Sequence, residues 1–253
     1  MLMVIDVGNT NTVLGLYRGE ELTHNWRLAT ERERTADEWG ILIRTLFNLG
    51  EIANGTVSAI VISSVVPPAR PALEEMALRY FGVQPLFIEP TMDLGMPVRY
   101  NPPGDVGADR IVNAMAAFTA FGGPVIVVDF GTATTFDAIS AAGEYLGGVI
   151  TPGIGISAEA LFLRAAKLPR VEIRPPAKII GDTTVASMQA GLFWGNVSLV
   201  DGVLKRMKQE LENAYVVSTG GLADLISPSC EEIDSVDRNL TLEGMRLIYE
   251  RLK

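Results

Sequence analysis

The chain has 253 residues, 48% hydrophobic and 20% charged, a composition typical of a globular protein rather than a disordered one. Its 30 acidic and 21 basic residues give a net charge of −9, which argues against a nucleic-acid partner because such partners need a basic surface. The single cysteine, Cys230, excludes an intrachain disulfide, argues against a cysteine-ligated metal and fits a reducing compartment.

The first half of the chain is predicted to form an antiparallel meander followed by alternating helices and strands. The meander is expected at residues 2–5, 13–17 and 21–28. Thr35 and Glu38 have the spacing of a capping box, which predicts a helix that Gly50 closes. A buried strand at 57–66, a helix near 69–80 and a short strand at 85–88 are expected next.

The second half is predicted to repeat this order. A proline-rich turn at 100–104 precedes a helix from about 105–107 to Phe121. Strands are expected at 125–128, 136–140, 145–150 and 215–217, and helices near 157–166, 184–211 and 241–252, with a short helix after residue 221.

Two uncharged stretches, residues 111–128 and 183–200, approach the length of a membrane span. Gly122-Gly123-Pro124 interrupts the first, which predicts a helix followed by a strand, and the second contains too many polar residues for lipid. The opening residues lack the basic segment of a secretory signal. We therefore expect a cytoplasmic protein that does not associate with a membrane.

One sequence pattern occurs twice, about half the chain length apart. DVGNTNT (6–12) and DFGTATT (129–135) share an Asp, an apolar residue, a Gly, two small polar residues and a final Thr. Each follows a buried strand and is followed by a Gly-Glu turn. This repetition predicts a duplicated domain with one such hairpin loop in each half.

Both loops have the chemistry of a phosphate site. Glycine permits close approach of the backbone, whose N–H groups bind anions, and Thr and Asn add donors without bulk. The Asp of each loop would lie beside a bridging cation rather than a phosphate. A single copy is equally well explained as ordinary hairpin turn chemistry. The chain contains neither a Walker-type motif nor a Rossmann fingerprint.

The duplicated loops are similar to the phosphate loops of the superfamily that includes acetate and sugar kinases, Hsp70 and actin. Within it the chain most resembles the type III pantothenate kinases. The matching blocks span nearly the whole chain and comprise residues 6–13, Tyr100-Asn101-Pro102, Gly107-Ala108-Asp109-Arg110, and residues 129–135, 147–157 and 181–191. The adenosine-type motif STGGLA at 218–223 resembles the adenosine motif of the wider superfamily.

This resemblance implies an α/β fold of two duplicated actin-like (ribonuclease H-like) domains with a nucleotide cleft between them. We expect the first domain at 1–116 and the second at 117–253, with a final helix that can cross back to the first. Members of the family are cytoplasmic homodimers that phosphorylate pantothenate with ATP, the first step of coenzyme A biosynthesis. They use a divalent metal such as Mg²⁺ with ATP, and K⁺ or NH₄⁺ as a monovalent cation.

The resemblance also implies residue roles. ATP would contact Asp6, Val7, Gly8, Asn9, Thr10, Asn11, Thr12, Val13 and Thr132, with Asp6 near the metal. Asp129 would hold the monovalent cation. Pantothenate would contact Tyr100, Gly107, Ala108, Asp109, Arg110 and Thr184, with Asp109 as the base. The chain carries Thr183 where Asn is common in the family, which leaves open whether Thr183 or Thr184 is the closer substrate contact.

Asp109 also suits this role on physical grounds, because phosphoryl transfer to an alcohol needs an acceptor for the hydroxyl proton. The dipole of the predicted helix favours its ionised form. An Asp in a first helical turn is, however, equally typical of a residue that only stabilises the helix. For Arg110, the sequence by itself favours a solvated surface side chain over a ligand for a substrate carboxylate.

Two alternatives share these features. One is a kinase of another small alcohol, since a fold does not determine the substrate. The other is a nucleotide-binding, non-catalytic transcription accessory protein of the same fold, against which the intact loops, Asp109, Arg110 and the acidic charge argue.

Overall fold

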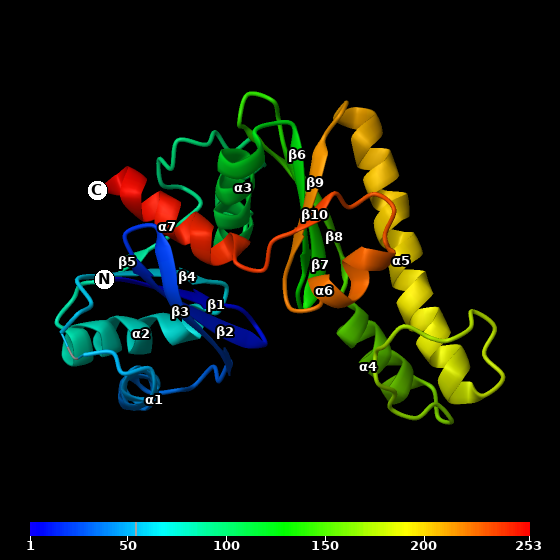
Figure 1. Ribbon diagram of the computed structural model, residues 1–253, viewed down its shortest axis with the longest axis horizontal. Helices are drawn as coiled ribbons and strands as arrows, with labels where there is room; N and C mark the ends of the chain where they lie inside the picture. The colour runs from blue at the N-terminus through cyan, green and yellow to red at the C-terminus, as the bar shows by residue number, and fades with distance from the viewer. Residues whose placement is uncertain (54) are drawn as a thin grey trace. The chain divides into compact units, whose positions relative to one another are not determined.

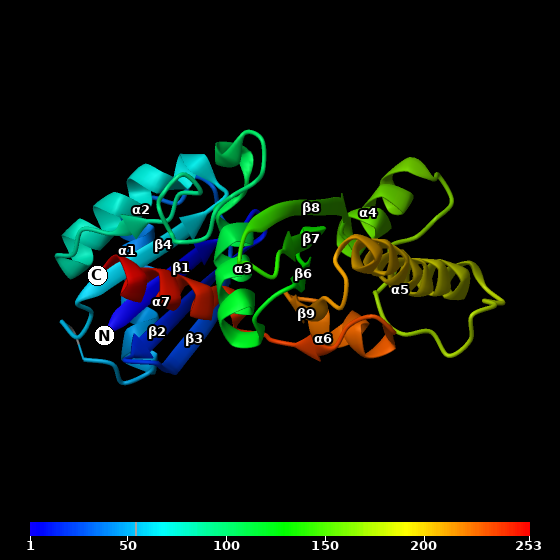
Figure 2. The same cartoon turned by 90° about the horizontal axis from the view of Figure 1, so that it is seen from above.

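The computed structural model describes residues 1–53 and 55–253 and divides into two compact units (Figures 1 and 2). The first unit comprises Met1–Gly95, Tyr100–Ala116 and Thr241–Lys253. The second comprises Met96–Arg99 and Ala117–Leu240. The chain therefore returns to the first unit for its last helix.

The first unit is built on a five-stranded mixed sheet with the order β3-β2-β1-β4-β5. Its strands are β1 (Leu2–Val7), β2 (Asn11–Arg18), β3 (Glu21–Ala29), β4 (Ala59–Ser64) and β5 (Leu86–Phe87). The pairs β1–β2 and β2–β3 are antiparallel, whereas β1–β4 and β4–β5 are parallel. The predicted meander is thus confirmed, and parallel strands extend it on one side.

Helices cover both faces of this sheet. They are α1 (Ala36–Leu49), α2 (Arg70–Met76), which continues as a π-helical turn over Ala77–Phe81, the first part of α3 (Ala108–Phe121) and α7 (Leu240–Leu252). The predicted capping box starts α1: the Glu38 N–H donates to Thr35 Oγ1 at 3.3 Å and the Thr35 N–H to Glu38 Oε2 at 2.8 Å. Trp39 and Ile43 of α1 then pack with Ile5 of β1 in the core.

The second unit contains another five-stranded mixed sheet, with the order β10-β9-β6-β7-β8. Its strands are β6 (Val125–Phe130), β7 (Ala133–Ile139), β8 (Tyr145–Pro152), β9 (Tyr215–Thr219) and β10 (Ser235–Val236). Its helices are the end of α3, α4 (Ile154–Arg164), α5 (Thr184–Glu210) and α6 (Ala223–Ile226). The apolar side of α5 packs on this sheet, where Phe193 and Val200 meet Val128 in a buried cluster.

The two sheets have the same topology. In each, the first strand pairs antiparallel with the second and parallel with the fourth, and the outer strands follow in the same order. This repetition confirms the predicted duplication and α/β class. Only β10 was not expected, because a two-residue strand carries too little pattern to be seen in the sequence.

The loops of the duplicated pattern differ in length by one residue. Val7 pairs with Thr12 across the first hairpin, whereas Phe130 pairs with Thr134 across the second. The structural counterpart of Thr12 is therefore Thr134 and not Thr135, which the sequence pattern aligned with it. A shorter turn has shifted the second strand by one position.

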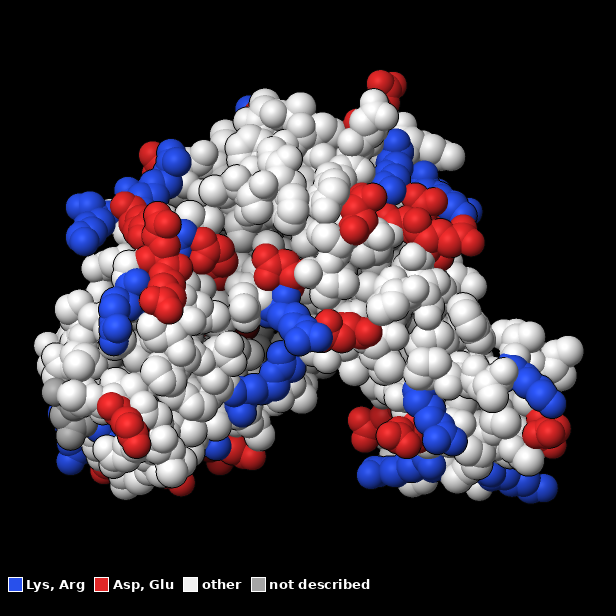
Figure 3. Space-filling model, in the orientation of Figure 1, with Lys and Arg blue, Asp and Glu red and all other residues white. Residues whose placement is uncertain are grey.

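The uncharged stretch 111–128 divides into α3 and β6, as the glycine-proline turn predicted. Within residues 1–53 and 55–253, no helix has both the length and the apolar character needed to cross a bilayer. Acidic and basic side chains are interspersed on the face shown in Figure 3. Exposed ion pairs such as Arg238 Nε with Asp224 Oδ2, at 2.7 Å, contribute little to stability at such surfaces.

Candidate active site

The first duplicated loop joins β1 to β2 through Gly8, Asn9 and Thr10. The Gly8 N–H donates to the Asn11 carbonyl at 3.0 Å and closes the turn. Asn9, Thr10 and Asn11 are exposed, whereas Thr12 is fully buried. Within the predicted ATP segment 6–13, the tip of the loop can therefore present groups to a ligand, and the flanking residues build its stem.

Asp6 lies at the end of β1, half-buried, beside Ser63 on the parallel strand β4. In open α/β sheets, ligands bind at the carboxyl ends of parallel strands. A carboxylate there, next to hydroxyl and backbone groups of the loop, offers the hard oxygen ligands that a divalent cation prefers. The residues present thus fit a metal–nucleotide ligand.

The start of α3 carries the predicted substrate-binding block. The Asp109 carboxyl folds back on the helix start, where its Oδ1 accepts the Arg110 N–H at 2.9 Å. A Cβ added to Gly107 would lie 2.4 Å from that same oxygen. A larger residue at position 107 would therefore displace the carboxyl group of Asp109.

Burial raises the pKa of Asp109 above the ordinary aspartate value, although the N–H and the charge of Arg110 act in the opposite direction. The sequence had suggested that the helix start would chiefly favour the ionised form, but loss of hydration outweighs this contribution. A carboxylate with a raised pKa is a stronger base than an ordinary aspartate.

Arg110 is buried, with only 7% of its surface exposed. The expectation of a solvated surface arginine is therefore wrong. On the same helix, α3 packs against α7 in the first unit, where Thr241 Oγ1 donates to Asn113 Oδ1 at 2.7 Å. A guanidinium shielded from water at the helix start is suited to binding a carboxylate.

Within the first unit, Val65, which follows β4, lies close to both the first loop and the start of α3. The Val65 N–H donates to the Val7 carbonyl at 3.1 Å, and a Cβ on Gly107 would lie 3.6 Å from Val65 Cγ1. Asp6 and Asp109 thus belong to the same edge of the first sheet. Tyr100 is half-buried on the segment that leads to this edge.

The second loop, Gly131-Thr132, joins β6 to β7, and the Gly131 N–H donates to the Ala133 carbonyl at 3.1 Å. Thr132 is exposed at its tip, and Asp129 is half-buried at the end of β6. A Cβ on Gly220, in the adenosine-type motif, would lie 2.3 Å from Asp129 Oδ1. The motif therefore packs directly on this carboxylate. The sequence analysis found both segments but not their contact.

Thr184 lies elsewhere in the second unit, at the first position of α5. The Thr183 hydroxyl caps this helix by accepting the Ala186 N–H at 3.1 Å. Thr184 is exposed and lines a groove of about 600 Å³ beside α4, together with Leu161, Asp182 and Met188. Thr183 is also exposed and lines the same groove, and its hydroxyl accepts the helix N–H while keeping its own proton to donate.

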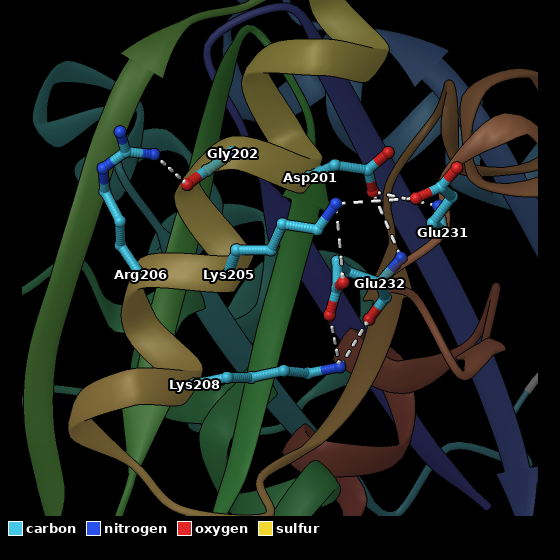
Figure 4. A network of polar contacts seen from close by, with 7 residues as sticks. All are labelled: Asp201, Gly202, Lys205, Arg206, Lys208, Glu231 and Glu232. Atoms are coloured by element: carbon cyan, nitrogen blue, oxygen red, sulfur yellow. Dashed lines mark hydrogen bonds and ion pairs between the residues drawn. The ribbon is translucent and has the colours of Figure 1, made fainter.

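A polar network fixes the segment that follows the adenosine-type motif (Figure 4). Asp201 of α5 accepts the N–H groups of Glu231 and Glu232 at 3.0 and 3.1 Å. Lys208 donates to the carbonyl and to the carboxylate of Glu232 at 3.1 and 3.0 Å. Burial and Asp201 raise the pKa of the neighbouring Cys230 to about 12, so this thiol is not an activated nucleophile.

The chain is similar to type III pantothenate kinases over its whole length. It is 53% identical to that of Koribacter versatilis, covering 99% of this chain and 96% of the relative. Identity is 54% with the Geobacter sulfurreducens protein, covering 99% of both chains, and 56% with that of Myxococcus xanthus, covering 99% and 98%.

Solved structures show the same fold at low sequence identity. A conserved putative Baf family transcriptional activator from Campylobacter jejuni has a TM-score of 0.63 at 20% identity, covering 99% of this chain and 98% of its own. A putative 2-dehydro-3-deoxygalactonokinase from Sinorhizobium meliloti has a TM-score of 0.63 at 12% identity, covering 100% and 97%. These similarities confirm the predicted actin-like fold class. The family model for type III pantothenate kinases matches residues 2–206, and together with the full-length relatives it shows that the chain belongs to this family.

Proposed function

We propose that the chain transfers the γ-phosphoryl group of ATP to the hydroxyl of pantothenate with Asp109 as the general base. Membership of the type III pantothenate kinase family supports the overall reaction. The observation that supports the base is the half-buried carboxyl of Asp109, whose pKa is raised, at the sheet edge that also carries the first loop.

In this reaction the ionised Asp109 accepts the hydroxyl proton of pantothenate as the hydroxyl oxygen attacks the γ-phosphorus in line. The bond from that phosphorus to the β–γ bridging oxygen breaks, and ADP leaves. The buried Arg110 binds the substrate carboxylate. Tyr100, Gly107 and Ala108 line the substrate at the helix start, and Thr184 contributes a hydroxyl.

The tips of the two loops bind the phosphates of ATP in this proposal, residues 6–13 from the first unit and Thr132 from the second. Their backbone N–H groups and small polar side chains supply donors. A divalent cation bound with ATP near Asp6 would neutralise charge on the phosphates.

Asp129 is the proposed ligand of a monovalent cation. Its half-buried carboxylate lies against Gly220 and close to Gly131, in a loop that also carries backbone carbonyls and the Thr132 hydroxyl. Oxygen ligands of this kind suit K⁺ or NH₄⁺. The bound cation would offset repulsion between Asp129 and the nucleotide phosphates.

We further propose a cytoplasmic homodimer formed through the second unit, with the duplicated domains divided at 116/117 and the final helix returning to the first. Large apolar side chains are exposed in this unit, several of them on the segments that carry the lining of the groove at Thr184. They include Ile150 (61%), Leu163 (65%), Ile179 (63%), Ile180 (82%) and Val185 (43%). Exposed apolar surface of this kind marks an interaction site, and a two-fold interface would bury it in both copies.

The experiment that tests the proposed function is ADP release with pantothenate and with a panel of other small alcohols. We expect rapid release with pantothenate and little with the panel. Faster release with another alcohol would indicate a different kinase, and no release with any acceptor in a protein that binds ATP would indicate a non-catalytic relative.

A further inference from the structure

The first phosphate loop is held from outside by Thr30, the residue that follows β3. The Thr30 N–H donates to the Thr10 carbonyl at 2.9 Å. The Thr30 and Thr12 hydroxyls lie 2.9 Å apart and share a hydrogen bond. Thr30 therefore forms hydrogen bonds at two points where the loop leads into β2, one on either side of Asn11.

The bond to the Thr10 carbonyl orients a donor of the loop. A trans peptide holds its C=O and the following N–H on opposite sides. Because the Thr10 carbonyl points to Thr30, the N–H of Asn11 points away from β3 and into the turn between β1 and β2. Backbone N–H groups of such a turn are the kind of donor that binds an anion.

The bond between the hydroxyls fixes the position of the stem. Thr12 is completely buried, and a buried hydroxyl that loses its partner destabilises the folded state. Its bond to Thr30 therefore ties the start of β2 to the end of β3. Thr30 is half-buried, and its hydrogen bonds to the loop are with the Thr10 carbonyl and the Thr12 hydroxyl.

The second loop is held differently at the equivalent position. The last residue of β3 pairs with the first residue of β2, and Thr30 comes directly after it. In the same way, the last residue of β8 pairs with the first residue of β7, and Gly153 comes directly after it. A Cβ on Gly153 would lie 2.3 Å from the Thr132 carbonyl oxygen and 2.8 Å from that of Gly131. Close backbone packing holds the second loop, so the fold itself does not require a hydroxyl here.

We propose that Thr30 is a positioning residue for ATP, which keeps the first loop in its phosphate-binding shape through the Thr12 hydroxyl. This inference rests on the proposed binding of ATP by residues 6–13. Thr30 acts through the loop and does not itself contact the substrates.

The test compares Thr30→Val, which keeps the shape but removes the hydroxyl, with Thr30→Ser, which restores it. Thr23→Val is the matched control, because Thr23 Oγ1 donates to the Leu16 carbonyl at 2.9 Å at the far end of the same β2–β3 hairpin. ATP affinity is measured by calorimetry on the full chain, together with KM for each substrate and the melting temperature.

We expect Thr30→Val to weaken ATP binding about tenfold, as loss of one buried hydrogen bond would. KM for pantothenate should be unchanged, and Thr30→Ser and Thr23→Val should bind ATP like the parent. Equal losses for both substrates, or normal ATP affinity with a lower melting temperature, would show that Thr30 is merely structural.

Two further variants keep the result unambiguous. If Thr30→Val does not fold, the double variant Thr12→Val/Thr30→Val leaves no buried hydroxyl unpaired, and normal ATP affinity in it would overturn the proposal. Asp6→Asn tests the ATP site itself. Weak ATP binding in Asp6→Asn with normal binding in Thr30→Val would refute only the positioning role, whereas normal binding in Asp6→Asn would refute the loop as the ATP site.

Discussion

The two phosphate loops occupy the same place in two sheets of identical topology, yet they are built differently. The first has one more residue than the second and is held at its stem by the Thr30 side chain. The second is shorter and is held by the backbone at Gly153, with Gly220 packed on Asp129. The same edge of the first sheet also carries Asp109. The two units therefore share one sheet topology but differ in their proposed roles in the reaction. In this proposal the base belongs to the first unit and the cation ligand to the second.

The largest expected effect tests whether the base belongs to the first unit. Asp109→Asn keeps the size of the side chain but cannot accept a proton, and we expect kcat to fall by at least about 10²-fold. The variant also removes a buried charge, so the melting temperature at neutral pH should not fall. Steady-state kinetics and calorimetry measure both. A normal kcat in the folded variant would assign the base elsewhere, and Asp6 is the next carboxylate to test.

The variants Asp6→Asn and Thr132→Val test whether both loops bind ATP. Each removes one polar group from a proposed ATP contact, and we expect each to reduce kcat/KM for ATP roughly tenfold or more without unfolding the protein. The first should also raise the requirement for Mg²⁺, because Asp6 is the proposed metal neighbour. Normal ATP kinetics in both variants would refute the binding of ATP by two loops.

The cation distinguishes the second loop from the first. If Asp129 holds a monovalent cation, activity should rise several-fold with K⁺ or NH₄⁺ and little with Na⁺ at matched ionic strength. Asp129→Asn should lose this response, whereas Thr30→Ser should retain it. Equal rates in Na⁺ and K⁺ would remove the proposed chemical difference between the two loops.

A smaller effect concerns assembly, because the exposed apolar cluster proposed as the dimer interface lies in the second unit. We expect a dimeric mass by light scattering at micromolar concentration. Ile180→Lys should weaken it, since a charge would be buried at the interface. Leu49→Lys, at a residue 78% exposed in the first unit, is the control and should leave the mass unchanged. A monomeric parent protein would refute the dimer.

The sequence predicted most of the fold because strand length, capping and glycine turns are local signals. Thr35 and Glu38 specified the start of α1, and the repeated Asp-x-Gly pattern revealed the duplication. The one-residue difference between the loops was not visible, since Thr12 and Thr135 match as letters although their strands differ in register.

Features that depend on tertiary contacts were missed. Arg110 is buried, and nothing near it in the sequence signals this; the contact of α3 with α7 through Asn113 and Thr241, which are far apart in the sequence, was not visible either. Thr30 lies in the polar segment before α1, and only the pairing of β2 with β3 brings it to the loop. The cap at Thr183 could have been predicted, because a Thr before an uncharged helical stretch is typical of an N-cap.

The central claim, that Asp109 with its raised pKa is the base, is tested most directly by the pH dependence of kcat at saturating substrates. Activity requires the ionised carboxyl, so kcat should fall as the pH is lowered through the pKa of Asp109. Because burial raises that pKa, we predict a one-proton acid limb centred above the ordinary aspartate range, and its loss in Asp109→Asn. A kcat that stays constant down to the ordinary aspartate range, or an acid limb that persists in Asp109→Asn, would contradict the account.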